Sequence, residues 1–258
     1  MRKIEILNQN EQQLFDDLPE YTVSEQKINF VLPDEVSTWA TTITIPSYLV
    51  GFILLWGYAK SKCKFFSPNR FKISDIQYVY KSMGIDQSTI SFITYSQRTY
   101  SYHKQIVRKY LQIKPFDKSA LDFSTEAVQD KVSRHQSPKQ ILYEVVQLCA
   151  KQPIEVPGYN RFTTIISEEL GKFEINLASI IRSSITLEQK HVLKELIKPD
   201  SSCNYPLTKF KTINQERNPA SIRDSVKDFL TIKNTLQIVL PLIKQLNLHA
   251  ETIKFFAT

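Results

Sequence analysis

One long stretch without charge sets the strongest limit on what this chain can fold into. No charged residue occurs between Ser37 and Ala59, and the densest apolar part begins at Tyr48. A membrane span needs about 20 predominantly apolar residues, whereas this run is shorter and follows a threonine-rich segment that contains Pro46. The pattern therefore predicts a helix buried in a protein core. A single membrane span is the rival interpretation, because Lys60 and the lysines close behind it would suit a cytoplasmic flank.

Helix signals recur along the rest of the chain and predict an all-α fold. Only 5 of the 258 residues are glycine, a low count that favours helices over turn-rich β-structure. Ser137-Pro138 places a capping residue before a proline at the first helical position, and Asn218-Pro219 repeats this arrangement. Thr186 is a third capping residue, followed by apolar residues at helical spacing. The expected fold class is thus all-α.

We predict two helix-turn-helix-like bundles followed by the start of a helical linker. The three predicted domains are residues 1–123, 137–198 and 205–258. The polar stretch from Asp122 to Ser137 is interpreted as the connection between the two bundles, because domain boundaries fall in exposed polar segments. A helix over residues 161–181, either continuous or broken near Gly171, would close the second bundle.

Charge is distributed unevenly along the chain, which indicates an anionic partner. The net charge of +7 comprises −5 over residues 1–59, +9 over residues 60–118 and +3 over the remainder. A basic block in an otherwise nearly neutral chain is typical of proteins that bind nucleic acid. An anionic membrane surface is the rival partner, and a lysine-rich face that is simply solvated is the third interpretation.

The cysteines indicate a reducing compartment. Cys63, Cys149 and Cys203 are odd in number and far apart, so they form neither a disulfide framework nor a C-x-x-C pair. A cytoplasmic location is therefore expected. The first ten residues also lack the apolar core of a signal peptide.

No motif of a known catalytic or cofactor site is found in the sequence. It has no glycine-rich phosphate loop, no H-E-x-x-H signature and no G-x-S-x-G elbow. The four histidines are isolated, whereas a metal site needs several ligands that converge. Adjacent carboxylates such as Asp16 and Asp17 do not face one another on a helix. We therefore expect no catalytic residue, no metal and no cofactor.

Residues 74–98 resemble a helix-turn-helix. The hydroxyl of Ser74 would cap the first helix, with Gln77 at the matching capping-box position, and Gly84 would form the turn. Apolar residues occupy the positions at which the two helices of such a motif touch: Val79, Met83, Ile85, Ile90 and Ile93. Tyr80 stands where the motif usually has a small residue, so an ordinary helical hairpin is an equal alternative.

Cations alternate with polar aromatic residues between Tyr95 and Tyr110. A helix over residues 101–113 would place Lys104 and Arg108 one turn apart on a shared face. We expect phosphate contacts from three side chains: Lys104, Arg108 and Lys109. The expected base contacts come from Gln97 and Arg98. The alternative is a basic amphipathic helix that simply faces water.

The same stretch resembles the N-terminal region of Tn-three-type transposases, a region often labelled a domain of unknown function in isolation. The family pattern contains a tyrosine, an arginine, a threonine and a histidine, then Ile-Arg, Leu-Gly and a phenylalanine. It is matched by Tyr95, Arg98, Thr99, His103, Ile106, Arg108, Leu111 and Phe116. The sequence departs from the pattern at Gln112, where the family usually has glycine, and at the inserted Val107.

Other segments match the family in the same order. The segment 49–55 resembles its Leu-Gly-Phe segment, and Val156-Pro-Gly158 with Arg161 resembles its Leu-Pro-Gly followed by an arginine. Residues 207–230 resemble its later helical connector. Charged residues that usually precede the Leu-Gly-Phe segment are replaced here by Thr41-Thr-Ile-Thr-Ile-Pro46. The resemblance adds Thr99, His103 and Arg161 to the expected DNA contacts.

The resemblance implies that the chain recognises the terminal inverted repeats of a transposon as double-stranded DNA. In the family, strand cleavage and transfer belong to a C-terminal RNase-H-like domain with an acidic triad and metal ions, and no such residue carries over to this sequence. The expected product is a DNA-binding fragment without catalytic activity. The alternatives are a helical protein–protein interaction module that self-associates through the apolar residues 236–256, an inert transposase remnant, or a membrane-associated protein.

Overall fold

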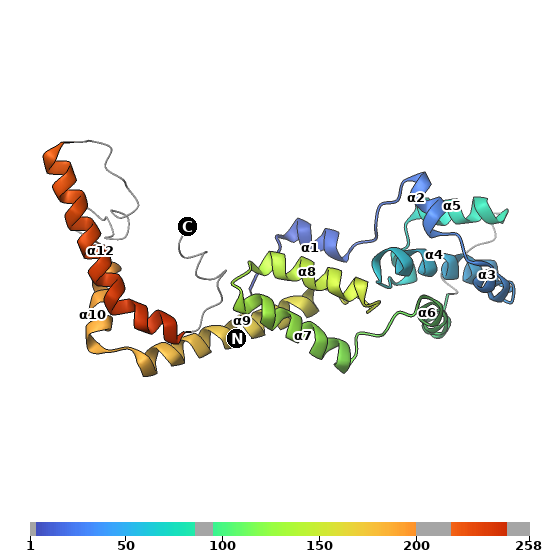
Figure 1. The fold of residues 1–258 in the computed structure, drawn as a ribbon. Helices are drawn as coiled ribbons and strands as arrows, with labels where there is room; N and C mark the ends of the chain where they lie inside the picture. Colours follow the sequence, from blue (N-terminus) through green and yellow to red (C-terminus); the bar gives the residue numbers. More distant parts are fainter. Residues whose placement is uncertain (1–3, 86–94, 200–217, 247–258) are drawn as a thin grey trace. The chain divides into compact units, whose positions relative to one another are not determined.

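The structure is a computed structural model that describes residues 4–85, 95–199 and 218–246 (Figure 1). These residues form helices and contain no β-strand, so the predicted all-α fold is confirmed. The chain forms two compact units. The first comprises residues 1–132 and 136–169, and the second comprises residues 133–135 and 170–258.

The first unit is built in part around one buried helix. Its elements in chain order are α1 (Gln9–Asp16), α2 (Val23–Asn29), α3 (Asp34–Ala40), α4 (Pro46–Lys62), the 3-10 turn η1 (Pro68–Arg70), α5 (Ile73–Met83), α6 (Gln97–Leu111), α7 (Lys118–Ser133), α8 (Pro138–Lys151) and the start of α9 (Tyr159–Ser184). In Figure 1, α4 lies among α2, α3, α5 and α6, and it contacts α2, α5 and α6. Every residue of α4 from Val50 to Ala59 is buried. The uncharged stretch is thus a core helix, as predicted.

A buried carboxylate links three of these helices. Asp75 of α5 is 1% exposed, and its carboxylate accepts hydrogen bonds from Tyr58 Oη at 2.6 Å and from Gln26 Nε2 at 2.7 Å. A buried polar group is tolerated when its hydrogen bonds are made. Burial and this carboxylate both raise the pKa of the Tyr58 phenol, so it remains a hydrogen-bond donor. The cluster fixes α2, α4 and α5 against one another.

Most of the stretch predicted to connect two domains, Asp122–Ser137, belongs to helix α7. Ala120, Ser124, Val128 and Val132 are buried at every fourth position, which gives α7 an apolar stripe. Asp117 Oδ1 accepts a hydrogen bond from the Ala120 N–H at 3.1 Å and caps the helix. The polar residues between the buried positions concealed this periodicity. The unit boundary falls after residue 169, inside α9.

The predicted helix starts were mostly confirmed. Capping boxes form at Ser137 with Gln140, at Thr186 with Gln189, and at Asn218 with Ser221. The exception is α5, which begins at Ile73 without a side-chain cap, so Ser74 lies inside the first turn. Helix α9 is continuous through Gly171.

The second unit contains the remainder of α9, helix α10 (Leu187–Leu196) and the long helix α12 (Pro219–Gln245). Helix α12 continues through Pro241, which lies inside it. Helices α10 and α12 contact one another, and Gln189 Nε2 donates a hydrogen bond to the Ile238 carbonyl at 3.0 Å. Among the described residues of both units, no helix is long and apolar enough to cross a membrane.

Candidate nucleic-acid interface

Helix α6 carries most of the residues expected to contact DNA, and local signals set both of its ends. Ser96 Oγ accepts a hydrogen bond from the Thr99 N–H at 3.1 Å, which satisfies one free donor of the first turn. The helix ends at Gln112, which adopts a left-handed conformation with φ 54°. At this position the pattern that the sequence resembles usually has glycine, the residue best suited to that conformation. With its first residue at Gln97, helix α6 begins four residues earlier than the predicted helix over residues 101–113.

His103 is a core residue. It is 4% exposed, its Nδ1 lies 2.8 Å from Tyr95 Oη, and aromatic rings, including those of Trp39 and Phe52, surround it. Burial lowers the pKa of its imidazole from 6.5 to about 4, so the ring is neutral at pH 7. The geometry gives His103 a packing role and leaves it no access to a phosphate.

Lys104 and Arg108 share one face of α6, as predicted, but this face is turned to Glu155. Lys104 Nζ lies 2.7 Å from Glu155 Oε1, and Arg108 forms an ion pair with Oε2 of the same carboxylate. Both cations also lie over the ring of Phe65, at 4.8 Å for Lys104 and 5.5 Å for Arg108. The side chains of Lys104, Arg108 and Glu155 are each at most a quarter exposed. This cluster fastens α6 to the loop before α9.

Backbone hydrogen bonds hold that loop in place. The Glu155 N–H donates to the Lys114 carbonyl and the Lys114 N–H donates to the Pro153 carbonyl, each at 2.8 Å. The Val156 N–H donates to the Cys63 carbonyl at 2.8 Å. Sequence reasoning missed Glu155, because it lies 51 residues from Lys104 and 47 from Arg108, beyond any local spacing rule.

Another side of α6 is open to solvent. Gln97, Arg98 and Lys109 are exposed, as the prediction of DNA contacts requires. Tyr102 is 53% exposed, and it follows Arg98 at helical spacing, as does exposed Gln105. Sequence reasoning missed these two residues, although the spacing from Arg98 would have found them. Thr99 is half-buried, and its hydroxyl lies 2.9 Å from Ser96 Oγ.

Arg161 lies elsewhere in the first unit. It is exposed in the first turn of α9, and its backbone N–H donates to the Gly158 carbonyl at 3.0 Å. Among the described residues, no hydrogen bond or ion pair joins it to α6, so the structure does not bring all eight predicted residues into one site. Those that share an open face are Arg98 and Lys109, whereas Gln97 is exposed at the start of α6 on the side of Lys104 and Arg108.

Much of the basic block is neutralised by the acidic segment that precedes it. Lys64 pairs with Asp16 at 2.7 Å, Arg70 pairs with Asp17 at 2.7 Å, and Lys72 pairs with Glu20 at 3.3 Å. The opposite charges of residues 1–59 and 60–118 thus partly meet inside the fold. The exposed cations of the block that form no ion pair with another described residue are Lys60, Lys62, Lys81, Arg98, Lys109, Lys114 and Lys118.

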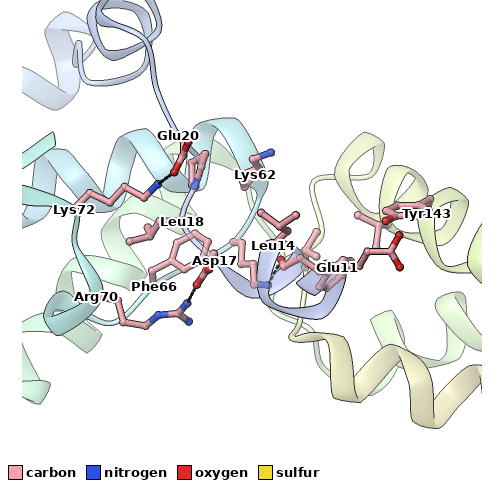
Figure 2. Close-up of a pocket in the computed structure, with 15 residues that line it drawn as sticks. Glu11, Leu14, Asp17, Leu18, Glu20, Lys62, Phe66, Arg70, Lys72 and Tyr143 are labelled. Atoms are coloured by element: carbon pink, nitrogen blue, oxygen red, sulfur yellow. Dashed lines mark hydrogen bonds and ion pairs between the residues drawn. The ribbon is translucent and has the colours of Figure 1, made fainter. Parts of the chain in front are cut away.

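These ion pairs border a groove of about 880 Å³ between α1, the end of α4, η1 and α8. Figure 2 shows its lining, with Lys72 bound to Glu20 and Arg70 bound to Asp17, and with Leu14 and Tyr143 in the groove. Its cations are held by carboxylates, apart from Lys62, and this leaves little free charge for an anion. No group of side chains suited to a metal ion occurs among the described residues.

The proposed helix-turn-helix is only partly described. Helix α5 ends at Gly84 with φ 63°, as expected for a turn glycine. Val79 is buried, whereas Met83, which the motif would bury, is 46% exposed. Ile90 and Ile93, in the predicted second helix, lie outside the described residues.

The sequence of the first unit matches a known family. A family model described as a domain of unknown function (DUF4158) matches residues 6–168. The chain belongs to this family. The family's domain extends from the segment before α1 into α9 and ends beside the unit boundary after residue 169. It therefore contains α6, the Glu155 cluster and Arg161. No curated protein matches the chain significantly.

Proposed function

We propose that this chain binds double-stranded DNA and recognises the terminal inverted repeats of a transposon, as the N-terminal part of a Tn-three-type transposase. The family match shows that residues 6–168 form a domain of a known family. The resemblance around Tyr95–Phe116 supports the assignment of this domain to transposases. We further propose that it binds DNA in a reducing cytoplasm without cleaving it, because the sequence offers no catalytic motif.

The observation that carries the proposal is the open face of α6. An α-helix fits the major groove of B-form DNA, and arginine and glutamine side chains pair with base edges there. Arg98 and Gln105 lie on this face with Tyr102 between them. Arg98, Gln105 and Gln97 at the start of the helix are the proposed base contacts.

Exposed lysines next to this face are the proposed phosphate contacts. Lys109 lies in the last turn of α6, Lys114 follows in the connection to α7, and Lys118 is the first residue of α7. All three are exposed and form no ion pair with another described residue, so their charge is available to a phosphate. Lys104 and Arg108 are engaged with Glu155, and their proposed role is to orient α6. Arg161 is an additional phosphate contact that lies outside this face.

The test is fluorescence anisotropy with two labelled duplexes, one carrying the element's terminal inverted repeat and one with the same bases scrambled, at several salt concentrations. We expect tighter binding to the repeat, with affinity that falls steeply as salt rises. Arg98→Ala should cost about 1–3 kcal/mol on the repeat and much less on the scrambled duplex. Lys109→Ala should weaken both and reduce the salt slope by about 1.

Lys227→Ala is the matched control, because it removes one exposed cation from α12, in the second unit. It should leave both affinities unchanged. Equal binding of the two duplexes by the unmodified chain would reduce the proposal to a basic surface without sequence readout. No binding at low salt would remove it.

A further inference from the structure

Helix α12 presents an apolar seam with the spacing of a coiled coil. The seam consists of Ile222, Val226, Phe229, Lys233, Leu236 and Leu240. Its positions alternate by four and three residues, which is the a/d pattern through which two helices pack side by side. The five apolar members are between 43% and 64% exposed, and Lys233 is also exposed.

A different face of α12 is already occupied. Val239 and Leu242 are buried where α12 packs with α10, and the Ile238 carbonyl accepts the hydrogen bond from Gln189. At about 100° per residue, the face that holds Val239 and Leu242 is centred roughly 130° from the centre of the seam, although Val239 is a neighbour of Leu236. The seam is therefore a second packing surface rather than the edge of the first.

The charges around the seam determine what kind of helix fits it. Lys233 lies within the seam, Lys244 borders it, and Arg223 is the next charged residue outward on the same side. The acidic side chains of the helix, Asp224 and Asp228, fall farther round toward the opposite side. Two copies of α12 would bring like charges together in either orientation, which disfavours pairing.

We propose that α12 is a docking site for an acidic amphipathic helix of another protein. The partner helix has its own apolar a/d stripe and carries carboxylates at the flanking e and g positions. Apolar side chains of the two stripes interdigitate, while the carboxylates face Lys233 and the neighbouring cations. This interaction is independent of the proposed DNA binding, because it uses no residue of α6.

The test uses two synthetic helical probes of about four heptads each, with the same valine and leucine seam. One probe has glutamate at every e and g position and the other has lysine there, so each repels itself and remains single. Binding to the full chain is measured by fluorescence polarisation of the labelled probes. We expect the glutamate probe to bind at least about tenfold more tightly than the lysine probe.

Two variants localise the effect. Phe229→Asp should abolish binding of the glutamate probe, and Lys233→Glu should weaken it by roughly fivefold while improving binding of the lysine probe. Lys227→Glu makes the same charge change on the far side of α12 and should change neither affinity. All three side chains are exposed, so folding should be preserved, and circular dichroism with the DNA anisotropy assay checks this.

Equal affinity for the two probes, or equal effects of Lys233→Glu and Lys227→Glu, would overturn the proposal. Sedimentation analysis of the full chain tests whether a second copy occupies the seam instead. Self-association of the unmodified chain that Phe229→Asp abolishes would make a second copy the occupant and would also overturn the proposal.

Discussion

The two units of the chain use their apolar residues in opposite ways. In the first unit, Phe52 is fully buried in α4 and contacts the rings of Trp39 and His103. In the second unit, Phe229 of α12 is 64% exposed. Both helices carry a high proportion of apolar residues, so apolar content alone does not determine burial. A helix becomes a core helix only when other elements cover it on every side, and uncovered apolar stripes are typical of surfaces that bind partners.

The two units also differ in how far their charged side chains form ion pairs. The first unit pairs its cations with carboxylates of distant segments, as in Lys64 with Asp16 and Lys104 with Glu155. The described cations of α12, such as Lys233, form no ion pair with another described residue. The first unit thus satisfies much of its charge internally, with Lys60, Lys62, Lys81 and the exposed cations around α6 as exceptions, whereas the second unit leaves both apolar and charged groups available.

The largest expected effect tests this contrast with one substitution in each unit. Phe52→Ala should destabilise the first unit by about 3–5 kcal/mol, because it removes a fully buried ring and leaves a cavity. Phe229→Ala should change stability by less than about 0.5 kcal/mol, since its ring is mostly in water. Urea unfolding followed by circular dichroism measures both. A loss at Phe229 comparable with that at Phe52 would mean that the ring is covered in solution, and the contrast would fail.

A smaller effect on stability is expected when the pH is lowered, because His103 becomes protonated. Because burial lowers its pKa to about 4 in the folded chain, while 6.5 is the ordinary value, protonation favours the unfolded state. This contribution to stability is complete above about pH 6.5 and is lost as the pH falls toward 4, by at most about 1.4 kcal/mol per pH unit. His103→Gln should flatten the loss measured by urea unfolding across this range.

His191→Gln is the matched control for His103, because His191 is exposed on α10 in the second unit. Its removal should leave the pH dependence of stability unchanged. An identical pH dependence in the His103→Gln variant and the unmodified chain would show that His103 titrates normally, and the enclosed aromatic setting inferred for it would be wrong.

The parts of the fold that depend on residues close together in the chain could be predicted from the sequence. The helix start at Ser137 and the buried helix at Val50–Ala59 were both predicted correctly, since each depends on neighbours within a few residues. The pairing of Lys104 and Arg108 with Glu155 was not predictable, because it depends on how the loop before α9 is bound to Lys114 and Cys63. Charge counts suggested a basic surface, but folding brings the opposing segments together and removes part of it.

The smallest expected effect has the opposite sign and concerns helix ends inside the first unit. Gln112 ends α6 with φ 54°, a conformation that costs a side-chain-bearing residue about 1 kcal/mol or more. Gln112→Gly should therefore stabilise the first unit, by about 0.5–1 kcal/mol after the greater entropy loss of glycine is deducted. Gly84 ends α5 with φ 63° and has no atom within 4 Å of an added Cβ, so Gly84→Gln should destabilise by a similar amount through the backbone alone. Urea midpoints measure both changes. Destabilisation by Gln112→Gly would mean that the exposed Gln112 side chain makes a contact in solution that outweighs its backbone strain. Contacts at the surface of the first unit, as well as those in its core, would then contribute to its stability.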